Sequence, residues 1–179
     1  MFITLRNVSE SVNVTQPKFR SVSAHVSFQS HVQSPDNNFA QSPELLSMAQ
    51  PGGSVRESSR LHIDDLKVTS GRLHINAPGT YFVYSSMHFK PRVGTFGYKL
   101  WEHNISLNRE NRPDETLAHS CHSCFTDCDR EVHTSYTGGV FQLRHNDLVY
   151  VNVTSKDLVA FDGQASYLGL IMIASSDGA

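Results

Sequence analysis

The chain has 179 residues, 39% of them hydrophobic, and a formal net charge of −2 at pH 7. This length fits one domain with a sizeable core, and so small a charge argues against a general attraction to nucleic acid or anionic membranes. No apolar run approaches the ~18 residues of a membrane-spanning helix, and the first ten residues, MFITLRNVSE, lack the pattern of a signal peptide. These observations predict a globular domain with no nucleic-acid partner.

Residues 1–20 are interpreted as an N-terminal arm that precedes the folded domain. They hold two N-x-S/T sequons, at Asn7 and Asn13, and two more sequons occur at Asn104 and Asn152. The composition yields about two such sequons by chance, so their number alone does not establish glycosylation. The four asparagines are therefore candidate glycosylation sites.

Short strands separated by turn residues follow along the chain. The alternating segment 23–29, SAHVSFQ, is predicted to be the first strand, and segment 30–59, rich in Ser, Pro, Asn, Gln and Gly, a long surface connection. In segment 66–76, LKVTSGRLHIN, two short strands flank Ser70-Gly71, which is typical of a hairpin.

The segment after Pro78-Gly79 is predicted to be a long strand with two different faces. One face carries Tyr81, Val83, Met87 and Phe89, and the other carries Phe82 and Tyr84. Another strand is expected over 99–107, KLWEHNISL, and a charged tip over 108–115.

The last third of the chain, 136–173, predicts three more strands. Gly138-Gly139 is expected to break the first of them. The segment LVYVNVT at 148–154 alternates with period two, which places Val149, Val151 and Val153 on one face. The final segment, YLGLIMI at 167–173, is apolar on both faces. Since an antiparallel strand with one solvated face alternates apolar and polar residues, the outer face of this strand requires a cover. That cover is either a loop of the same chain or another subunit.

Regularly spaced short strands, with no helix of normal length, indicate an all-β sandwich. The sequence also resembles the tumour necrosis factor cytokines. The similarity rests on YTGGVFQL at 136–143, on Tyr-Leu-Gly at 167–169 and on the segment 73–89, LHINAPGTYFVYSSMHF, where Thr80 and Ser86 depart from the family pattern.

The resemblance implies a two-sheet antiparallel jelly roll over residues 21–175, followed by a short tail at 176–179. It also implies assembly as a homotrimer, and among the branches of the family the chain is most similar to the death ligands of the TRAIL type. Heterologous contacts that close into a ring are the expected basis of such a trimer.

The same resemblance identifies candidate residues for the trimer interface. Three aromatic positions that line the family's subunit interface fall on Tyr84, Tyr136 and Tyr167, and the outer side of the last strand adds Ile171 and Ile173. Tyrosine suits such an interface because its ring buries a large area while its hydroxyl keeps a polar partner.

Three cysteines lie close together in the segment CHSCFTDC, with His119, His122 and His133 nearby. They are Cys121, Cys124 and Cys128. The C-x2-C spacing with histidines favours zinc, but there is no second C-x-x-C pair. A second interpretation is a disulfide within the segment, which leaves one free thiol. A third is that all three thiols are free. A death-ligand relative implies a fourth, a zinc ion on the trimer axis held by one cysteine per subunit, here Cys121 or Cys124.

The charged tip is the candidate receptor contact. In the family, receptors lie in the grooves between subunits and touch the corresponding loop, which here carries Arg109, Glu110, Arg112 and Asp114 but lacks the usual aromatic anchor. The loop is either a solvated loop with no partner, or it binds the receptor through complementary charges, which would set the specificity and the association rate.

The resemblance thus implies an extracellular cytokine, whose partners are further copies of itself and a receptor of the TNF-receptor type, and which triggers immune or apoptotic signalling. Such a chain is the secreted or cell-surface ectodomain of a type II membrane protein. A complement-type globular head is the alternative. An enzyme is not expected, because the sequence has neither the clustered metal ligands of a cupin nor another catalytic motif. No cofactor is expected beyond the possible axial zinc.

Overall fold

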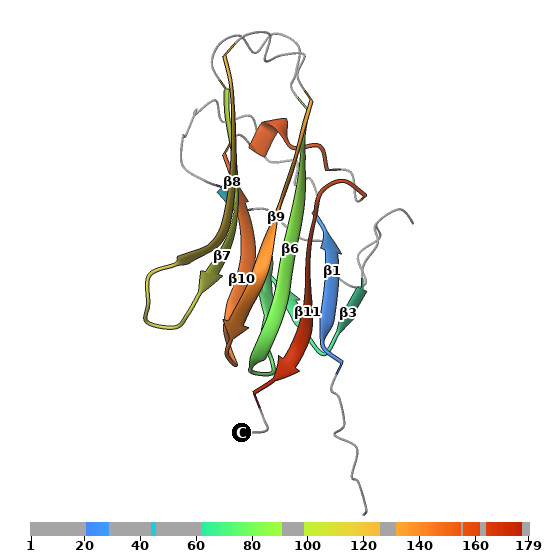
Figure 1. The fold of residues 1–179 in the computed structure, drawn as a ribbon, viewed down its shortest axis with the longest axis vertical. Helices are drawn as coiled ribbons and strands as arrows, with labels where there is room; N and C mark the ends of the chain where they lie inside the picture. Colours follow the sequence, from blue (N-terminus) through green and yellow to red (C-terminus); the bar gives the residue numbers. More distant parts are fainter. Residues whose placement is uncertain are drawn as a thin grey trace, which may run out of the picture.

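The computed structural model of the protein describes residues 21–28, 44–45, 62–90, 99–125, 132–154, 156–161 and 164–176. Over these residues the chain forms eleven β-strands and one 3-10 helix, η1 (Lys156–Leu158). The strands make two antiparallel sheets that pack face to face (Figure 1). The N-terminal arm, with Asn7 and Asn13, lies outside the described residues.

The first sheet has the order β3-β1-β11-β6-β9. Its strands are β1 (Ser23–Ser27), β3 (His62–Asp64), β6 (Gly79–Phe89), β9 (His133–Leu143) and β11 (Tyr167–Ser175). The first strand of the chain therefore pairs with the last, and each neighbour along the sheet comes from a distant part of the sequence.

The second sheet has the order β4-β5-β10-β7-β8, with β2 paired to β10 beside this path. Its strands are β2 (Glu44–Leu45), β4 (Lys67–Thr69), β5 (Arg72–His74), β7 (Lys99–Asn108), β8 (Glu115–Cys124) and β10 (Leu148–Val153). The two antiparallel sheets confirm the predicted jelly-roll sandwich.

The core lies between the sheets and is built by period-two alternation. Val149, Val151 and Val153 on β10 are fully buried, as the pattern predicted, and they belong to the same hydrophobic cluster as Tyr81 and Val83 of β6. Burying a side chain of this size stabilises the fold by roughly 1.5–3 kcal/mol. The alternation of each strand thereby decides which side chains remain for the outer surface.

The predicted hairpin at Ser70-Gly71 is confirmed. Thr69 pairs with Arg72 across a two-residue turn, and both turn residues have positive φ angles, 50° and 73°. This is the geometry of a type I′ turn, whose twist matches that of the strands it joins.

The expected strand break at Gly138-Gly139 is wrong, because β9 passes through both residues without interruption. Gly138 pairs with Tyr84 of β6, and a Cβ atom there would lie 2.6 Å from the backbone oxygen of Val83. The glycine thus allows two backbones to approach closely rather than ending the strand.

The predicted surface connection 30–59 lies outside the described residues except for Glu44–Leu45, which pairs with β10. Among the described residues, no helix has the length and apolar character needed to cross a membrane.

Candidate functional site

The outward side of β11, β6 and β9 carries a continuous set of apolar side chains. The pairing places them in cross-strand rows, because residues directly opposite each other share a face of the sheet. One row is Ile171, Phe82 and Val140, and another is Tyr167, Ser86 and Tyr136. Tyr84 lies between these rows, next to Gly138 and Gly169. We call this set the outer apolar face; it consists of Phe82, Tyr84, Tyr136, Val140, Tyr167 and Ile171.

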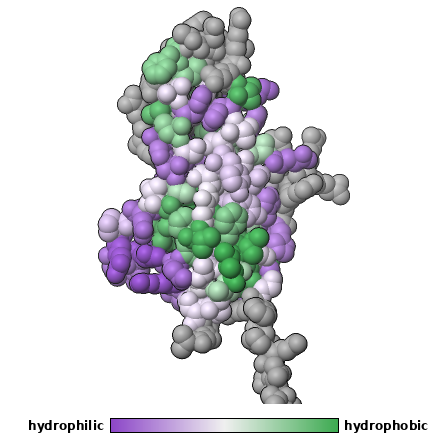
Figure 2. All heavy atoms as spheres, viewed as in Figure 1, coloured by the Kyte–Doolittle hydropathy of each residue, from purple (hydrophilic) through white to green (hydrophobic). Residues whose placement is uncertain are grey.

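Several of these side chains are largely exposed in the single chain. Tyr136 is 57%, Val140 58% and Ile171 48% exposed. Figure 2 shows hydrophobic residues gathered where β9, β6 and β11 run side by side. A contiguous apolar patch of this kind marks an interaction surface.

Tyr84 stands at the centre of the outer apolar face and is held from several sides. Its ring stacks on Phe82 with centroids 5.6 Å apart and meets Tyr167 edge-on at 6.2 Å. The ring covers Gly169, where a Cβ atom would lie 2.2 Å from Cζ of Tyr84. Burial, followed by the nearby Tyr167 and Tyr136, raises the pKa of the Tyr84 phenol. The ring is therefore positioned before any partner arrives.

His25 of β1 extends the aromatic cluster to a fourth strand. It pairs with Gly169, and its Nδ1 lies 3.2 Å from the hydroxyl oxygen of Tyr84. Its ring is 4.5 Å from that of Tyr167. Sequence reasoning did not identify His25, although the alternation of segment 23–29 could have placed it on the same side as Ser23 and Ser27.

The structure brings four of the five predicted interface residues together. Tyr84, Tyr136, Tyr167 and Ile171 belong to the outer apolar face. Ile173 is 55% exposed, but it lies in the β-bulge between Met172 and Ala174, where the pairing with β6 shifts register. Phe82 and Val140 were missed as interface candidates, because only the register of three separate strands reveals that they share a row with Ile171.

Arg109, one of the predicted receptor contacts, is a structural link between two loops. Its Nε donates to both carboxylate oxygens of Asp147, at 3.2 and 3.3 Å, and its Nη2 donates to the backbone oxygen of Gln142 at 3.2 Å. Its Nη1 donates to Glu115 at 3.3 Å. Asp147 is only 3% exposed, so the guanidinium balances a buried carboxylate and ties the charged tip to the β9–β10 turn.

Asp114, in the loop between β7 and β8, is also held by hydrogen bonds. Its carboxylate accepts hydrogen bonds from the Tyr150 hydroxyl and from Nδ2 of Asn108. These two bonds lower the pKa of Asp114, while burial and the bond to Asp114 raise the pKa of Tyr150 to about 12. Of the four predicted contacts, Glu110 and Arg112 are the exposed ones that hold no such link.

The cysteines have different environments. Cys124 is 4% exposed and disulfide-bonded, whereas Cys121 is an exposed free thiol on the outward side of β8. Cys128 lies outside the described residues. The nearby His122 does not join Cys121: its ring stacks on His133 at 4.2 Å and on Trp101 at 5.2 Å, on the inner side of the strand.

Two sequon asparagines lie directly opposite each other on the outward side of the second sheet. Asn104 of β7 pairs with Asn152 of β10, and both are half-buried. Asn152 accepts a hydrogen bond at 3.2 Å from the hydroxyl of Ser106, itself the third residue of the Asn104 sequon.

Residues 54–173 match the model of the TNF (Tumour Necrosis Factor) family. The chain is 32% identical over 110 residues to tumor necrosis factor ligand superfamily member 6 of Macaca nemestrina, covering 60% of this chain and 39% of that protein. Against the human protein of that name the identity is 29% over 110 residues, with coverages of 60% and 38%.

The chain is also similar to tumor necrosis factor ligand superfamily member 10 of Mus musculus, with 26% identity over 116 residues. That match covers 58% of this chain and 40% of the relative. The chain thus aligns with about two fifths of the length of these relatives.

Proposed function

Because the chain belongs to the tumour necrosis factor family, we propose that it is an extracellular trimeric cytokine that binds and clusters receptors of the TNF-receptor type. The observation that carries this proposal is the outer apolar face. Three of its large side chains are about half exposed, and covering them would contribute roughly 1 kcal/mol each per subunit. A ring of three copies buries this face on every subunit at once.

The proposed mechanism is geometric and involves no catalysis. Three identical grooves between subunits would hold three receptor chains at fixed separations, and multivalent binding would compensate for modest affinity at each groove. Glu110 and Arg112 at the exposed tip are the proposed contacts to the receptor, where their charges would steer association. Arg109 and Asp114 would support this tip from within, since their side chains are already bonded to Asp147 and Tyr150.

We place the protein outside the cell, as the secreted or cell-surface ectodomain of a type II membrane protein. The similarity to superfamily members 6 and 10 supports a death-ligand type of signal, in which receptor clustering triggers apoptotic or immune responses.

The test combines the mass in solution with binding to a surface coated with TNF-receptor-type ectodomains. Light scattering should give three times the chain mass of 20.0 kDa. Tyr167→Asp should give single chains, because assembly would bury three carboxylates in the apolar interface without partners. On the receptor surface this variant should dissociate at least ~100-fold faster than the trimer, because multivalent binding is lost.

Thr116→Asp is the matched control, since Thr116 is exposed on β8 in the other sheet. It should keep both the trimeric mass and the slow dissociation. A Tyr167→Asp protein that stays trimeric at micromolar concentration would refute the interface. A wild-type trimer that binds no receptor of this type would refute the cytokine function while leaving the assembly intact.

A further inference from the structure

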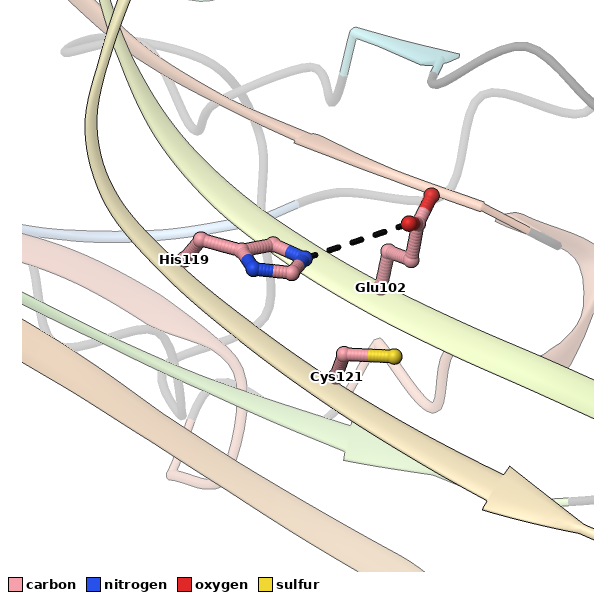
Figure 3. A group of neighbouring side chains, drawn as sticks. All are labelled: Glu102, His119 and Cys121. Carbon is pink, nitrogen blue, oxygen red and sulfur yellow. Dashed lines mark ion pairs between the residues drawn. The ribbon is translucent and has the colours of Figure 1, made fainter.

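Glu102, His119 and Cys121 form a compact cluster on the outward side of β7 and β8 (Figure 3). One ligand atom from each side chain lies within 4.8 Å of the other two. The three side chains thus offer an oxygen, a nitrogen and a sulfur donor on the same side of the sheet. We propose that this cluster binds one zinc ion per chain.

The pairing of the two strands explains why these residues meet. Glu102 is directly opposite Cys121, and His119 is opposite Asn104. His119 and Cys121 are two residues apart on one strand, so both point to the same face as Glu102. The imidazole then spans the diagonal to the carboxylate, with Nε2 of His119 3.9 Å from Oε1 of Glu102.

The spacing suits a tetrahedral zinc ion after small side-chain movements. Zinc bonds of about 2.0–2.3 Å to N, O and S place neighbouring ligand atoms roughly 3.4 Å apart. The ligand atoms of the cluster are already within 4.8 Å of one another, so rotations that move them by about 1 Å are sufficient. A mixed N, O and S donor set matches the borderline-soft character of zinc. Three protein ligands leave a fourth position for water.

The backbone beneath the cluster is held in place. The amide of Glu102 donates to Oγ1 of Thr154 at 2.7 Å, and the carbonyl of Glu102 accepts from the Thr154 amide at 3.2 Å. Cys121 is paired within the β7–β8 ladder. Only side-chain torsions therefore need to adjust when the ion binds, which limits the entropy that binding costs.

A bound ion would also change the chemistry of the free thiol. Cys121 is exposed and lies three residues before the disulfide-bonded Cys124, and a free thiolate can attack a disulfide. Coordination of the Cys121 sulfur by zinc would occupy the attacking atom. The ion would thereby protect the neighbouring disulfide from exchange.

This site differs from a zinc ion shared by cysteines on a three-fold axis. It is complete within one chain, and it lies on the sheet that does not carry the outer apolar face. It requires neither assembly nor a receptor. Stoichiometry separates the two possibilities, because a site within each chain binds one ion per chain and an axial site binds one ion per three chains.

The experiment is a titration of the chelator-treated full chain with Zn²⁺, and in parallel with Co²⁺. We expect one ion per chain and an intense near-ultraviolet band from thiolate-to-cobalt charge transfer. Cys121→Ser should abolish this band, and His119→Ala and Glu102→Gln should each weaken Zn²⁺ binding roughly 10-fold or more. Circular dichroism checks that each variant is folded, which we expect because the three side chains lie at the surface.

His145→Ala and Glu110→Gln are the matched controls, because they remove a histidine and a glutamate at exposed loop positions outside the cluster. They should bind Zn²⁺ as the wild type does. The proposal is overturned if the wild type retains no Zn²⁺ at micromolar concentration, or if the test variants bind as tightly as the controls. One ion per three chains that survives His119→Ala and Glu102→Gln would also overturn it, in favour of cysteines alone.

Discussion

Protonation of His103 should destabilise the folded chain as the pH falls. His103 of β7 is fully buried between the sheets. Its Nε2 lies 2.9 Å from the hydroxyl oxygen of Ser85 and its Nδ1 lies 3.1 Å from that of Ser135. Since the Ser85 hydroxyl donates to the backbone oxygen of Tyr167 at 2.7 Å, Nε2 carries the proton and Nδ1 accepts from Ser135. A second proton would place a charge in the core.

The size of the effect follows from the pKa. Burial, followed by the nearby His119, lowers the pKa of His103 from 6.5 to about 4. Between these two values the unfolded chain binds a proton here and the folded chain does not, so the free energy of unfolding rises with pH across this window. At 1.36 kcal/mol per pH unit, this one residue removes about 3 kcal/mol of stability when the pH falls from 6.5 to 4. That is a large share of a typical domain's 5–15 kcal/mol.

The assay is chemical denaturation from pH 4 to 8 at a fixed protein concentration, with EDTA present so that His119 holds no metal. His103→Gln is the comparison, because the amide keeps one donor and one acceptor but does not titrate. The other histidines contribute equally to both proteins and cancel in the difference. We expect the two curves to run parallel above pH 7 and to diverge below pH 6.5. Curves that stay parallel down to pH 4 would refute the reasoning.

Two further predictions concern loop anchoring and strand packing. Arg109→Met should lower the free energy of unfolding by about 2–3 kcal/mol, because it leaves the Asp147 carboxylate, which is 3% exposed, without its cation. Glu110→Ala, at the exposed neighbouring position, should change the free energy of unfolding by no more than about 0.5 kcal/mol. Equal costs, measured by urea denaturation, would contradict this role. Gly138→Ala should lower the free energy of unfolding by about 2–3 kcal/mol, and Gly169→Ala by about 1 kcal/mol. The methyl group at position 138 meets a backbone oxygen at 2.6 Å, whereas the methyl group at position 169 meets the end of the Tyr84 ring. The reverse order in the same assay would show that the backbones separate more easily than the ring rotates.

The sequence by itself determined the local structure. Period-two alternation put the valines of β10 on one face, which is buried, and it put Tyr167 and Ile171 on one face of β11, which is the outward face. The Ser70-Gly71 turn was readable for the same reason, because positive φ angles restrict the residues a two-residue hairpin accepts. The predicted strand break at Gly138-Gly139 was wrong, because a pair of glycines can either end a strand or allow two backbones to pack closely. In β9 the glycines allow close packing.

Only the tertiary structure decided which distant residues meet. The strand order and register put Phe82, Val140 and Ile171 in one row, and they put Glu102 opposite Cys121. No local pattern encodes such pairings, because register is selected by burying one face of every strand at the same time. Candidates for the subunit interface could therefore be named only residue by residue, from the resemblance to the family, whereas the full outer apolar face and the cluster on the other sheet depend on long-range packing.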